Sequence, residues 1–405
     1  MQILQPLRNK VFAGLWVSYS VSVAATAILP TILTLMILDW HNGIADLGIA
    51  LSVRTFGFVA GAVVGGYFAD RWPRQKVLCA ASALRSASTL AIASLFHDNI
   101  IAIACCLFFS GAGEGIFRSA YQATMADVIS AEFRQSANAL TTLSLRIALT
   151  AGPLLAVVIH SSFGAEFGLG VVSFLWALSA TVIFILQRRL IRQGVPSRRA
   201  NANFLSDYRD GLAEAFRHRW FIAGLSVLLI WLGLGNSIQQ LMLPVISRTY
   251  LNGDAFIGIA LGAYSIGALA AGAFLGSFRV SRPGILAFCG LALYGLVPMA
   301  LYSHSAALIV LSYFLGGVGI ELFNIPWFTA IQNEVPKDML GRVSSIDFLI
   351  SYGAAPLTLA AMPMFVVSAG QEVALLAAGA VVLVAPLLAL VVPGVAFFKE
   401  PARNS

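Results

Sequence analysis

The chain has 405 residues, of which 59% are hydrophobic and 11% are charged, and its formal net charge is +7. A soluble domain carries about 25% charged residues, so this composition excludes a chain whose whole surface faces water. The apolar residues gather in blocks of about 20 or more, long enough to cross a hydrocarbon core of about 30 Å as α-helices. We therefore expect an all-α membrane protein.

Twelve such blocks follow one another along the chain. They cover residues 11–38, 46–69, 77–96, 100–128, 135–160, 167–186, 220–250, 255–278, 284–302, 306–334, 341–367 and 372–397. Several exceed the minimum span, which indicates tilted helices or ends that project into water. The first block is long and has no small-residue cleavage site, so we expect a retained helix rather than a signal peptide.

The basic residues gather on one side of this arrangement. Five of the 25 Lys and Arg lie well within predicted helices, namely Arg54, Arg85, Arg118, Arg146 and Arg248. The other 20 fall in the two termini, in the segments that join alternate blocks and, for Arg342, at the start of the eleventh block. This is the positive-inside pattern of a chain with both termini in the cytoplasm. The positive charge therefore predicts topology in a bacterial inner membrane, and no nucleic-acid partner is expected.

One long polar stretch divides the chain into two halves of similar size. We expect an N-terminal six-helix bundle over residues 1–187, a cytoplasmic connection over 188–218 and a C-terminal six-helix bundle over 219–405. The sequence GIAL at residues 48–51 recurs at 258–261, where it opens the second helix of its half. Such self-similarity indicates an internal repeat.

The fourth block of each half extends this repeat. A shift of 207 positions pairs Glu114 with Glu321 and Asp127 with Glu334. Parallel repeats of six helices, with a binding site near the midplane, are a known transporter plan.

The loop after the second block reads GYFADRWPRQK at residues 66–76. It resembles the GxxxD(R/K)xGxx(R/K) motif of the major facilitator superfamily and stands where that family carries it, although Pro73 replaces the usual glycine. The resemblance implies twelve helices in two pseudo-symmetric bundles. It also implies a cytoplasmic gate formed by Gly66, Asp70, Arg71, Arg74, Asp127 and Arg342. An anchor at the lipid headgroups is the alternative role for this loop.

Other stretches resemble the drug- and siderophore-exporting branch of that superfamily, which includes macrolide and enterobactin exporters. They are residues 7–12, 136–140 and 340–345, together with an arginine sixteen residues before the motif aspartate. The chain departs from this branch at Tyr121, where an arginine is frequent, and Arg118 lies one turn earlier. The resemblance implies export of a small organic molecule.

Ionisable side chains within the predicted spans need a physical reason, because a charge at the bilayer centre costs about 2.5–3.5 kcal/mol. Glu114 precedes Arg118 by one turn, which allows either a self-satisfied intrahelical pair or a pair that faces a cavity. Glu321 has no cation one turn away, so we expect it to carry the coupling proton, with Glu114 second and a protonated packing residue as the alternative. If Arg54 and Arg146 face inward with Arg118, an anionic substrate is favoured, since guanidinium binds carboxylate through two hydrogen bonds.

Three further groups have expected structural roles. We expect Arg85 to extend toward the cytoplasm and Arg248 toward the outer face, with their charged ends in water. Asp347 is near the inner end of its helix, where we expect it to pair with Arg342 or to cap the helix rather than to act as a coupling group.

Aromatic and amide residues complete the candidate cavity, on helices that line it in the family that the chain resembles. The candidates for substrate contact are Arg54, Glu114, Arg118, Tyr121, Gln122, Arg146, Asn236, Gln240, Tyr264, Glu321, Asn324 and Trp327. Any one of the aromatic residues could equally serve helix packing or the interfacial belt.

Four cysteines lie within the predicted spans in no CxxC spacing, so we expect buried free thiols, and neither a metal site nor a cofactor. No nucleotide-binding loop or catalytic triad is visible, which disfavours primary pumping and enzymatic chemistry. We expect a monomeric secondary transporter that exports a small organic molecule by alternating access in exchange for protons, with an anionic, siderophore-like substrate. Broad drug efflux and a non-transporting receptor or scaffold are the alternatives.

Overall fold

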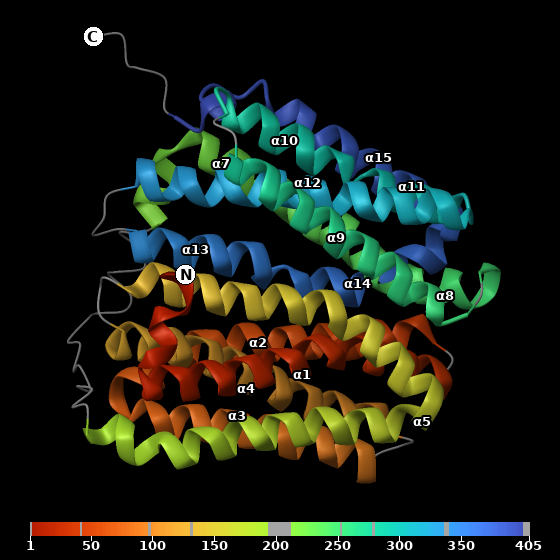
Figure 1. Cartoon of the computed structure of the whole chain (residues 1–405). Helices are drawn as coiled ribbons and strands as arrows, with labels where there is room; N and C mark the ends of the chain where they lie inside the picture. Colours follow the sequence, from red (N-terminus) through yellow and green to blue (C-terminus); the bar gives the residue numbers. More distant parts are fainter. Residues whose placement is uncertain are drawn as a thin grey trace, which may run out of the picture. The chain divides into compact units, whose positions relative to one another are not determined.

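The computed structural model describes residues 2–40, 43–95, 99–129, 133–192, 212–251, 253–277, 280–335 and 340–399. These residues form helices joined by turns and contain no strand, as the apolar blocks predict. The chain divides into two compact units, Met1–Asn201 and Ala202–Ser405, coloured red to yellow-green and green to blue in Figure 1.

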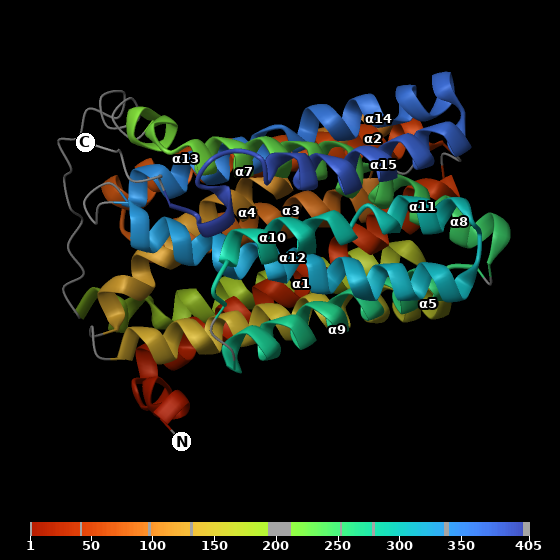
Figure 2. The ribbon, with the colours of Figure 1, turned by 90° about the horizontal axis from the view of Figure 1, so that it is seen from above.

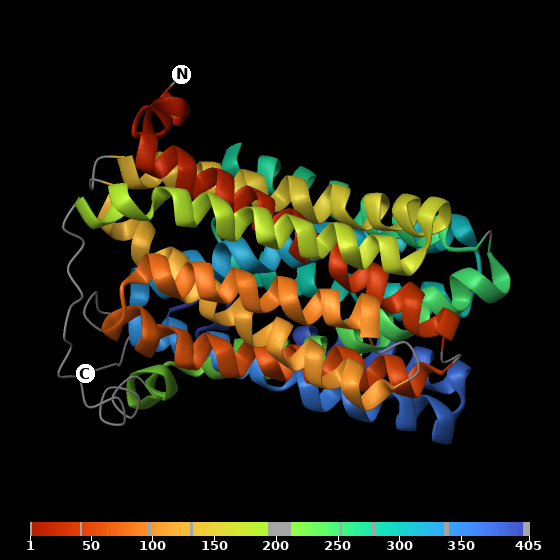
Figure 3. The ribbon, with the colours of Figure 1, turned by 90° about the horizontal axis from the view of Figure 1, so that it is seen from below.

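The N-terminal unit begins with a short 3-10 helix followed by five long helices. They are η1 (Gln2–Arg8), α1 (Lys10–Trp40), α2 (Ile44–Arg71), α3 (Arg74–Leu95), α4 (Ile100–Val128) and α5 (Arg134–Arg192). α5 contains the fifth and sixth predicted spans. At Gly164 the backbone takes φ 84° and ψ 173°, and the chain turns back there (Figures 1 and 3). Glycine adopts this positive φ without the steric penalty of a Cβ.

The C-terminal unit has more and shorter helices. They are α7 (Arg219–Ile230), η3 (Trp231–Asn236), α8 (Ser237–Tyr250), α9 (Ala255–Ser277), α10 (Pro283–Leu293), α11 (Leu296–Tyr302), α12 (Ala306–Glu334), α13 (Leu340–Gly353), α14 (Ala355–Ala369), α15 (Gln371–Ala389) and η4 (Val395–Phe397). α12 packs between α9 and α10 (Figures 1 and 2).

The seventh span is continuous in direction but contains an irregular turn. α7 runs into the π-helical turn η3, and α8 completes the span. The carbonyl of Leu232 accepts two hydrogen bonds from Ser237, one from the backbone N–H and one from Oγ at 2.9 Å. Single π turns inside α-helices are frequent at functional sites.

Eleven helical segments of the described chain are long and apolar enough to cross a membrane. One of them, Ser136–Leu186, is the run that turns back at Gly164, so all twelve predicted spans are found. The predicted end of the last span was wrong. α15 stops at Ala389, eight residues short of the predicted end, and Gly394 then takes φ 91°.

The cysteines were only partly predicted. All four are free thiols, but none is buried, because Cys79 and Cys106 are half-buried and Cys105 and Cys289 are exposed.

Close contacts between helices repeat in the two units. A Cβ placed on Gly57 of α2 would lie 2.2 Å from the carbonyl oxygen of Phe108, and one on Gly267 of α9 would lie 2.0 Å from that of Phe314. Gly267 follows Gly57 by 210 positions, as predicted, whereas Phe314 follows Phe108 by 206.

A second contact gives the same shift. Gly111 faces the carbonyl oxygen of Arg54, and Gly317, 206 positions later, faces that of Tyr264. The bounds of the helices agree, because α12 begins and ends 206 positions after α4. α4 and α12 therefore correspond at a shift of 206 rather than the predicted 207.

One residue of shift rotates a helix by about 100°, so the predicted pairing of the two glutamates was wrong. Glu114 corresponds to Ile320, and Glu321 corresponds to Gly115. The sequence register followed matching residue types, whereas the helix contacts depend on where the backbone can approach closely. The argument that Glu321 occupies the same place as Glu114 in the repeat therefore no longer holds.

Candidate functional site

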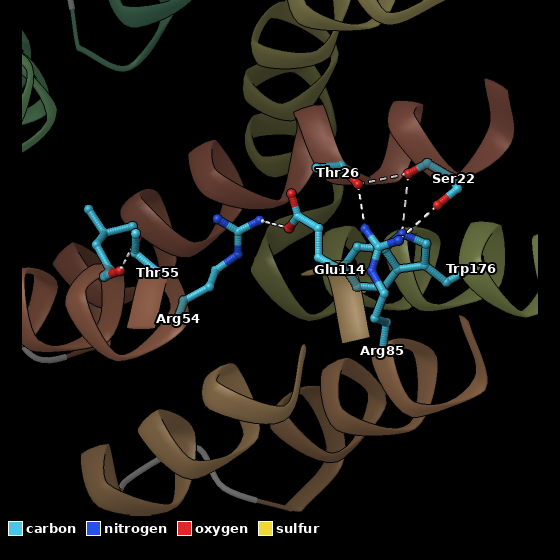
Figure 4. Close-up of polar contacts among 8 residues, drawn as sticks. Ser22, Thr26, Arg54, Thr55, Arg85, Glu114 and Trp176 are labelled. Atoms are coloured by element: carbon cyan, nitrogen blue, oxygen red, sulfur yellow. Dashed lines mark hydrogen bonds and ion pairs between the residues drawn. The ribbon is translucent and has the colours of Figure 1, made fainter. Parts of the chain in front are cut away.

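An ion pair joins α2 to α4 in the N-terminal unit. Arg54 Nη2 lies 2.6 Å from Glu114 Oε2, and the two side chains are 14% and 21% exposed (Figure 4). The sequence considered Arg118 as the partner of Glu114 within the same helix. The guanidinium carbon of Arg118 lies 6.0 Å from the ring centre of Phe58, on α2. Glu114 is thus held by a neighbouring helix.

A second guanidinium lies beside this pair. Arg85 of α3 is 1% exposed and donates to Ser22 Oγ at 2.8 Å and to Thr26 Oγ1, both on α1 (Figure 4). Its guanidinium carbon lies 4.1 Å from the ring centre of Trp176, a cation–π contact. The prediction that Arg85 extends to the cytoplasm was therefore wrong.

Gly113 explains why Arg85 can enter the unit. A Cβ at this position would lie 2.6 Å from Cγ of Arg85, so only glycine leaves room for the arginine stem. Because Glu114 is the next residue, the same slot brings Arg85 near the carboxylate, and the charges of Glu114 and Arg54 both act on it. The cluster, defined as Arg54, Arg85 and Glu114, has two cations for one carboxylate.

Removing one member of the ion pair is expected to destabilise the N-terminal unit. Arg54→Met leaves a half-buried carboxylate, and Glu114→Gln leaves a half-buried guanidinium, each costing roughly 1–3 kcal/mol, between the values for surface and buried pairs. The double variant should recover most of this loss, since no charge is left unpaired. The apparent melting temperatures of the unmodified protein, the two single variants and the double variant are measured in detergent and form a double-mutant cycle. Losses of the single variants that simply add in the double variant would contradict the coupling.

The other predicted residues of this unit lie on α4 and α5. Tyr121 is buried, stacks on Tyr19 with ring centres 4.3 Å apart, and its hydroxyl lies 3.3 Å from Thr141 Oγ1. Gln122 is exposed and Arg146 is half-buried. Tyr121 therefore packs within the unit.

The predicted gate is described in part. Arg74 forms an ion pair with Asp127 and donates to the carbonyl of Ala123 at 2.8 Å, which ties the start of α3 to the end of α4. Arg71 is exposed. The surroundings of Gly66 and the side chains of Asp70 and Arg342 lie outside what the structure describes. The bond between Arg74 and Asp127 lies within one unit, so a latch between the two units stays a proposal.

The C-terminal unit holds a small pocket. Its volume is about 80 Å³, and its lining comes from the seventh, tenth and eleventh spans. The lining residues are Leu228, Trp231, Leu232, Ile320, Asn324, Trp327, Phe328, Asp347 and Ser351. Asp347 is 6% exposed, and its Oδ1 accepts a hydrogen bond from Trp327 Nε1 at 3.0 Å. The sequence predicts a helix cap or a partner of Arg342 here. The structure gives Asp347 an indole donor, and the side chain of Arg342 lies outside the described residues.

Aromatic packing fixes the donor. Trp327 stacks on Phe221 and Phe323, with ring centres 5.2 Å and 5.4 Å apart. A Cβ on Gly224 would lie 2.1 Å from the indole ring, so this glycine admits Trp327. The indole N–H is consequently held toward Asp347.

The remaining candidates of this unit are dispersed. Glu321 is 4% exposed and does not line the pocket. Asn236 belongs to the π turn, Gln240 to α8, and both are half-buried. Tyr264 of α9 lies edge-on to Tyr294, with ring centres 6.3 Å apart.

Arg248 lies in the last turn of α8 and donates two hydrogen bonds to Asp254, at 2.6 Å from Nε and 3.0 Å from Nη2. Asp254 lies just before α9, so the side chain of Arg248 is directed toward the turn between α8 and α9.

The sequence missed the partners of the buried charges. Ser22 and Thr26 are one turn apart on α1. The sequence shows this pair of hydroxyl groups, but only the structure shows that both accept hydrogen bonds from Arg85. Trp176 comes from the far part of α5 and donates through Nε1 to the carbonyl of Ser22 at 3.2 Å. No sequence signal joins these three helices.

Residues 15–239 match the family model described as Major Facilitator Superfamily. The chain belongs to the major facilitator superfamily. Proteins named Enterobactin exporter EntS are similar over most of their length. The one from Shigella flexneri is 22% identical over 360 residues, and the one from Escherichia coli O1:K1 / APEC is 24% identical over 365 residues. In both cases the match covers 83% of this chain and 80% of the relative.

Solved structures of the superfamily share the fold. A peptide transporter POT in complex with sulfate has a TM-score of 0.77 at 15% identity, covering 97% of this chain and 96% of that one. The nucleoside transporter NupG has a TM-score of 0.71 at 14% identity, covering 94% and 99%. The chain is therefore a multi-pass membrane transporter with the fold of the major facilitator superfamily.

Proposed function

We propose that this transporter exports a small organic anion from the cytoplasm by alternating access, in exchange for protons, in a bacterial inner membrane. The cluster of Arg54, Arg85 and Glu114 carries the proposal. Arg54 is paired with Glu114, and the second guanidinium, that of Arg85, lies near them inside a membrane-spanning unit, where each charge needs compensation. The relatives named enterobactin exporters support the direction and a siderophore-like substrate.

The chemistry of the cluster supports an anion in particular. Arg54 already binds one carboxylate at 2.6 Å, so it can bind another carboxylate or a phenolate of similar geometry. Arg118 is exposed on α4, one turn beyond Glu114, where it can add a second contact. Glu114 then competes with the substrate for Arg54. Competition of this kind needs an ionised carboxylate, so it suits Glu114 better than the role of proton carrier does.

Proton exchange requires a carboxyl group that can change its charge state. Glu321 is the residue that the sequence favours for it, with Glu114 second. The side chain of Glu321 is buried, at 4% exposure.

Substrate charge is expected to decide the effect of Arg54→Ala and Arg118→Ala. Because a hydrogen bond to a charged group contributes about 1.5–3 kcal/mol, each variant should lose roughly tenfold or more of its enterobactin transport, and much less of its transport of the cation ethidium. Purified protein in proteoliposomes with an imposed pH gradient gives both rates.

Arg248→Gln is the matched control, because it removes an arginine that pairs with Asp254 outside the cluster. Its ratio of enterobactin to ethidium transport should equal that of the unmodified protein. Equal losses of both compounds in the Arg54 and Arg118 variants would favour broad drug efflux. No pH-driven flux of either compound through the unmodified protein would favour a receptor or scaffold.

A further inference from the structure

The pocket of the C-terminal unit contains polar atoms that its own side chains leave unsatisfied. Among the described residues, Trp231 Nε1 and Ser351 Oγ are buried without a hydrogen-bond partner, and both residues line the pocket. Asp347 uses Oδ1 for Trp327, and no other bond of its carboxyl group is described. A volume of about 80 Å³ has room for about two waters at ~30 Å³ each.

The charged surroundings of Asp347 are sparse. α13 packs against α7, α12 and α14. Their titratable groups in the described chain are Arg219, Tyr313, Glu321 and Glu334, and α14 has none. None of these four residues lines the pocket. Arg342, on α13 itself, has a side chain outside the described residues. Asp347 is thus the one ionisable residue among the described side chains that line the pocket.

The shift of 206 positions between α4 and α12 shows which part of α4 corresponds to the α12 side of this pocket. Ile320, Asn324, Trp327 and Phe328 stand 206 positions after Glu114, Arg118, Tyr121 and Gln122. The wall that α12 gives to the pocket is therefore the repeat of the α4 face that carries the candidate substrate residues. Glu321 lies about 100° away from Ile320 around α12, off this wall.

The hydrogen bond to Asp347 is repeated as well. Tyr121 contacts Thr141 at 3.3 Å, and Trp327 contacts Asp347 at 3.0 Å, with both residues of the second pair 206 positions later. A carboxyl group therefore stands where the N-terminal unit has a neutral hydroxyl. On the matching faces, the N-terminal unit has Glu114 and the C-terminal unit has Asp347, one carboxyl group each.

We propose that Asp347 is a proton-binding residue, reached by water held in the pocket between Trp231, Asn324 and Ser351. Its ionised form is buried against a single neutral donor, and binding a proton removes that uncompensated charge. The bond from Trp327 holds in both states, because Oδ1 accepts in each. The proton then sits on the second oxygen, directed to water or to Ser351. The use of this proton-binding site in transport rests on the proposed proton exchange, whereas the existence of the site does not.

The test needs no substrate. Infrared difference spectra of the purified protein in lipid nanodiscs are recorded against pH, and the C=O absorption of protonated carboxyl groups is followed. Asp347→Asn keeps the shape of the side chain and an oxygen for Trp327, and it should remove one titrating band. Asp347→Thr reproduces the hydroxyl of Thr141 and should remove the same band, which guards against a misfolded first variant.

Three results would overturn the proposal. One is an unchanged set of bands in both folded Asp347 variants. Another is loss of that band in Glu321→Gln instead, which would make Glu321 the site. The third is a shift of the band on adding NaCl at constant pH, which would make the ligand a metal cation. Export of enterobactin plays no part in this readout, so a different substrate would leave the result intact.

Discussion

Gly57→Val and Gly267→Val are each expected to prevent folding of their unit. At both positions a Cβ would lie 2.0–2.2 Å from a backbone carbonyl oxygen of the partner helix, closer than any real contact. Backbone atoms of a packed helix cannot rotate away as a side chain can, so α2 must separate from α4, or α9 from α12. Overpacking costs about 1–3 kcal/mol where side chains can adjust, and a separation of whole helices costs more. Size-exclusion chromatography of the detergent-solubilised protein should show aggregate instead of a single symmetric peak.

The same substitution at other glycines is the control. Gly170 in α5 and Gly272 in α9 have no atom within 4 Å of the place a Cβ would take. Gly170→Val and Gly272→Val should therefore elute as the unmodified protein does. A normal elution of Gly57→Val would show that α2 and α4 are less closely packed than described, and aggregation of all four variants would indicate a general intolerance of valine.

The number and order of the spans could be predicted because they depend on local properties. Apolar length located all twelve spans, and Gly164 falls in the gap between the fifth and sixth blocks. The equivalence of Glu114 and Glu321 failed for a different reason. A repeat that has diverged keeps its close backbone contacts, such as Gly111 on the carbonyl of Arg54, longer than its residue types. Matching two glutamates therefore placed the register one residue off.

The direction of a buried charge also could not be predicted. The sequence shows that Arg85 lies in a span, but extension to the cytoplasm and entry into the bundle are equally compatible with that position. Gly113 decides between them by opening a slot on another helix. Asp347 is a similar case, since its partner Trp327 is oriented by Phe323 one turn earlier on α12 and also by Phe221 of α7, which is distant in the sequence.

Arg85→Met is expected to leave the protein as stable as before and to lower the proposed export of an anion at least tenfold. Methionine fills most of the apolar space of the arginine stem, and it removes a buried charge whose described hydrogen bonds go to neutral hydroxyl groups, so the cost of burying that charge is removed as well. Thr26 Oγ1 already bonds to the carbonyl of Ser22 at 2.9 Å, and a helical serine hydroxyl can bond to the carbonyl one turn earlier. The apparent melting temperature should therefore stay the same or rise.

Transport should respond in the opposite way, because the charge of Arg85 acts on Glu114 and Arg54 from within the same unit. Without it the cluster has one cation for one carboxylate, and nothing remains to attract a second anion. Enterobactin efflux from proteoliposomes should fall at least tenfold, which corresponds to about 1.4 kcal/mol. Arg85→Lys keeps the positive charge and should retain part of the activity. A stable Arg85→Met protein with full efflux would show that the arginine serves packing alone, and a large fall in melting temperature would show that its bonds to α1 stabilise the unit.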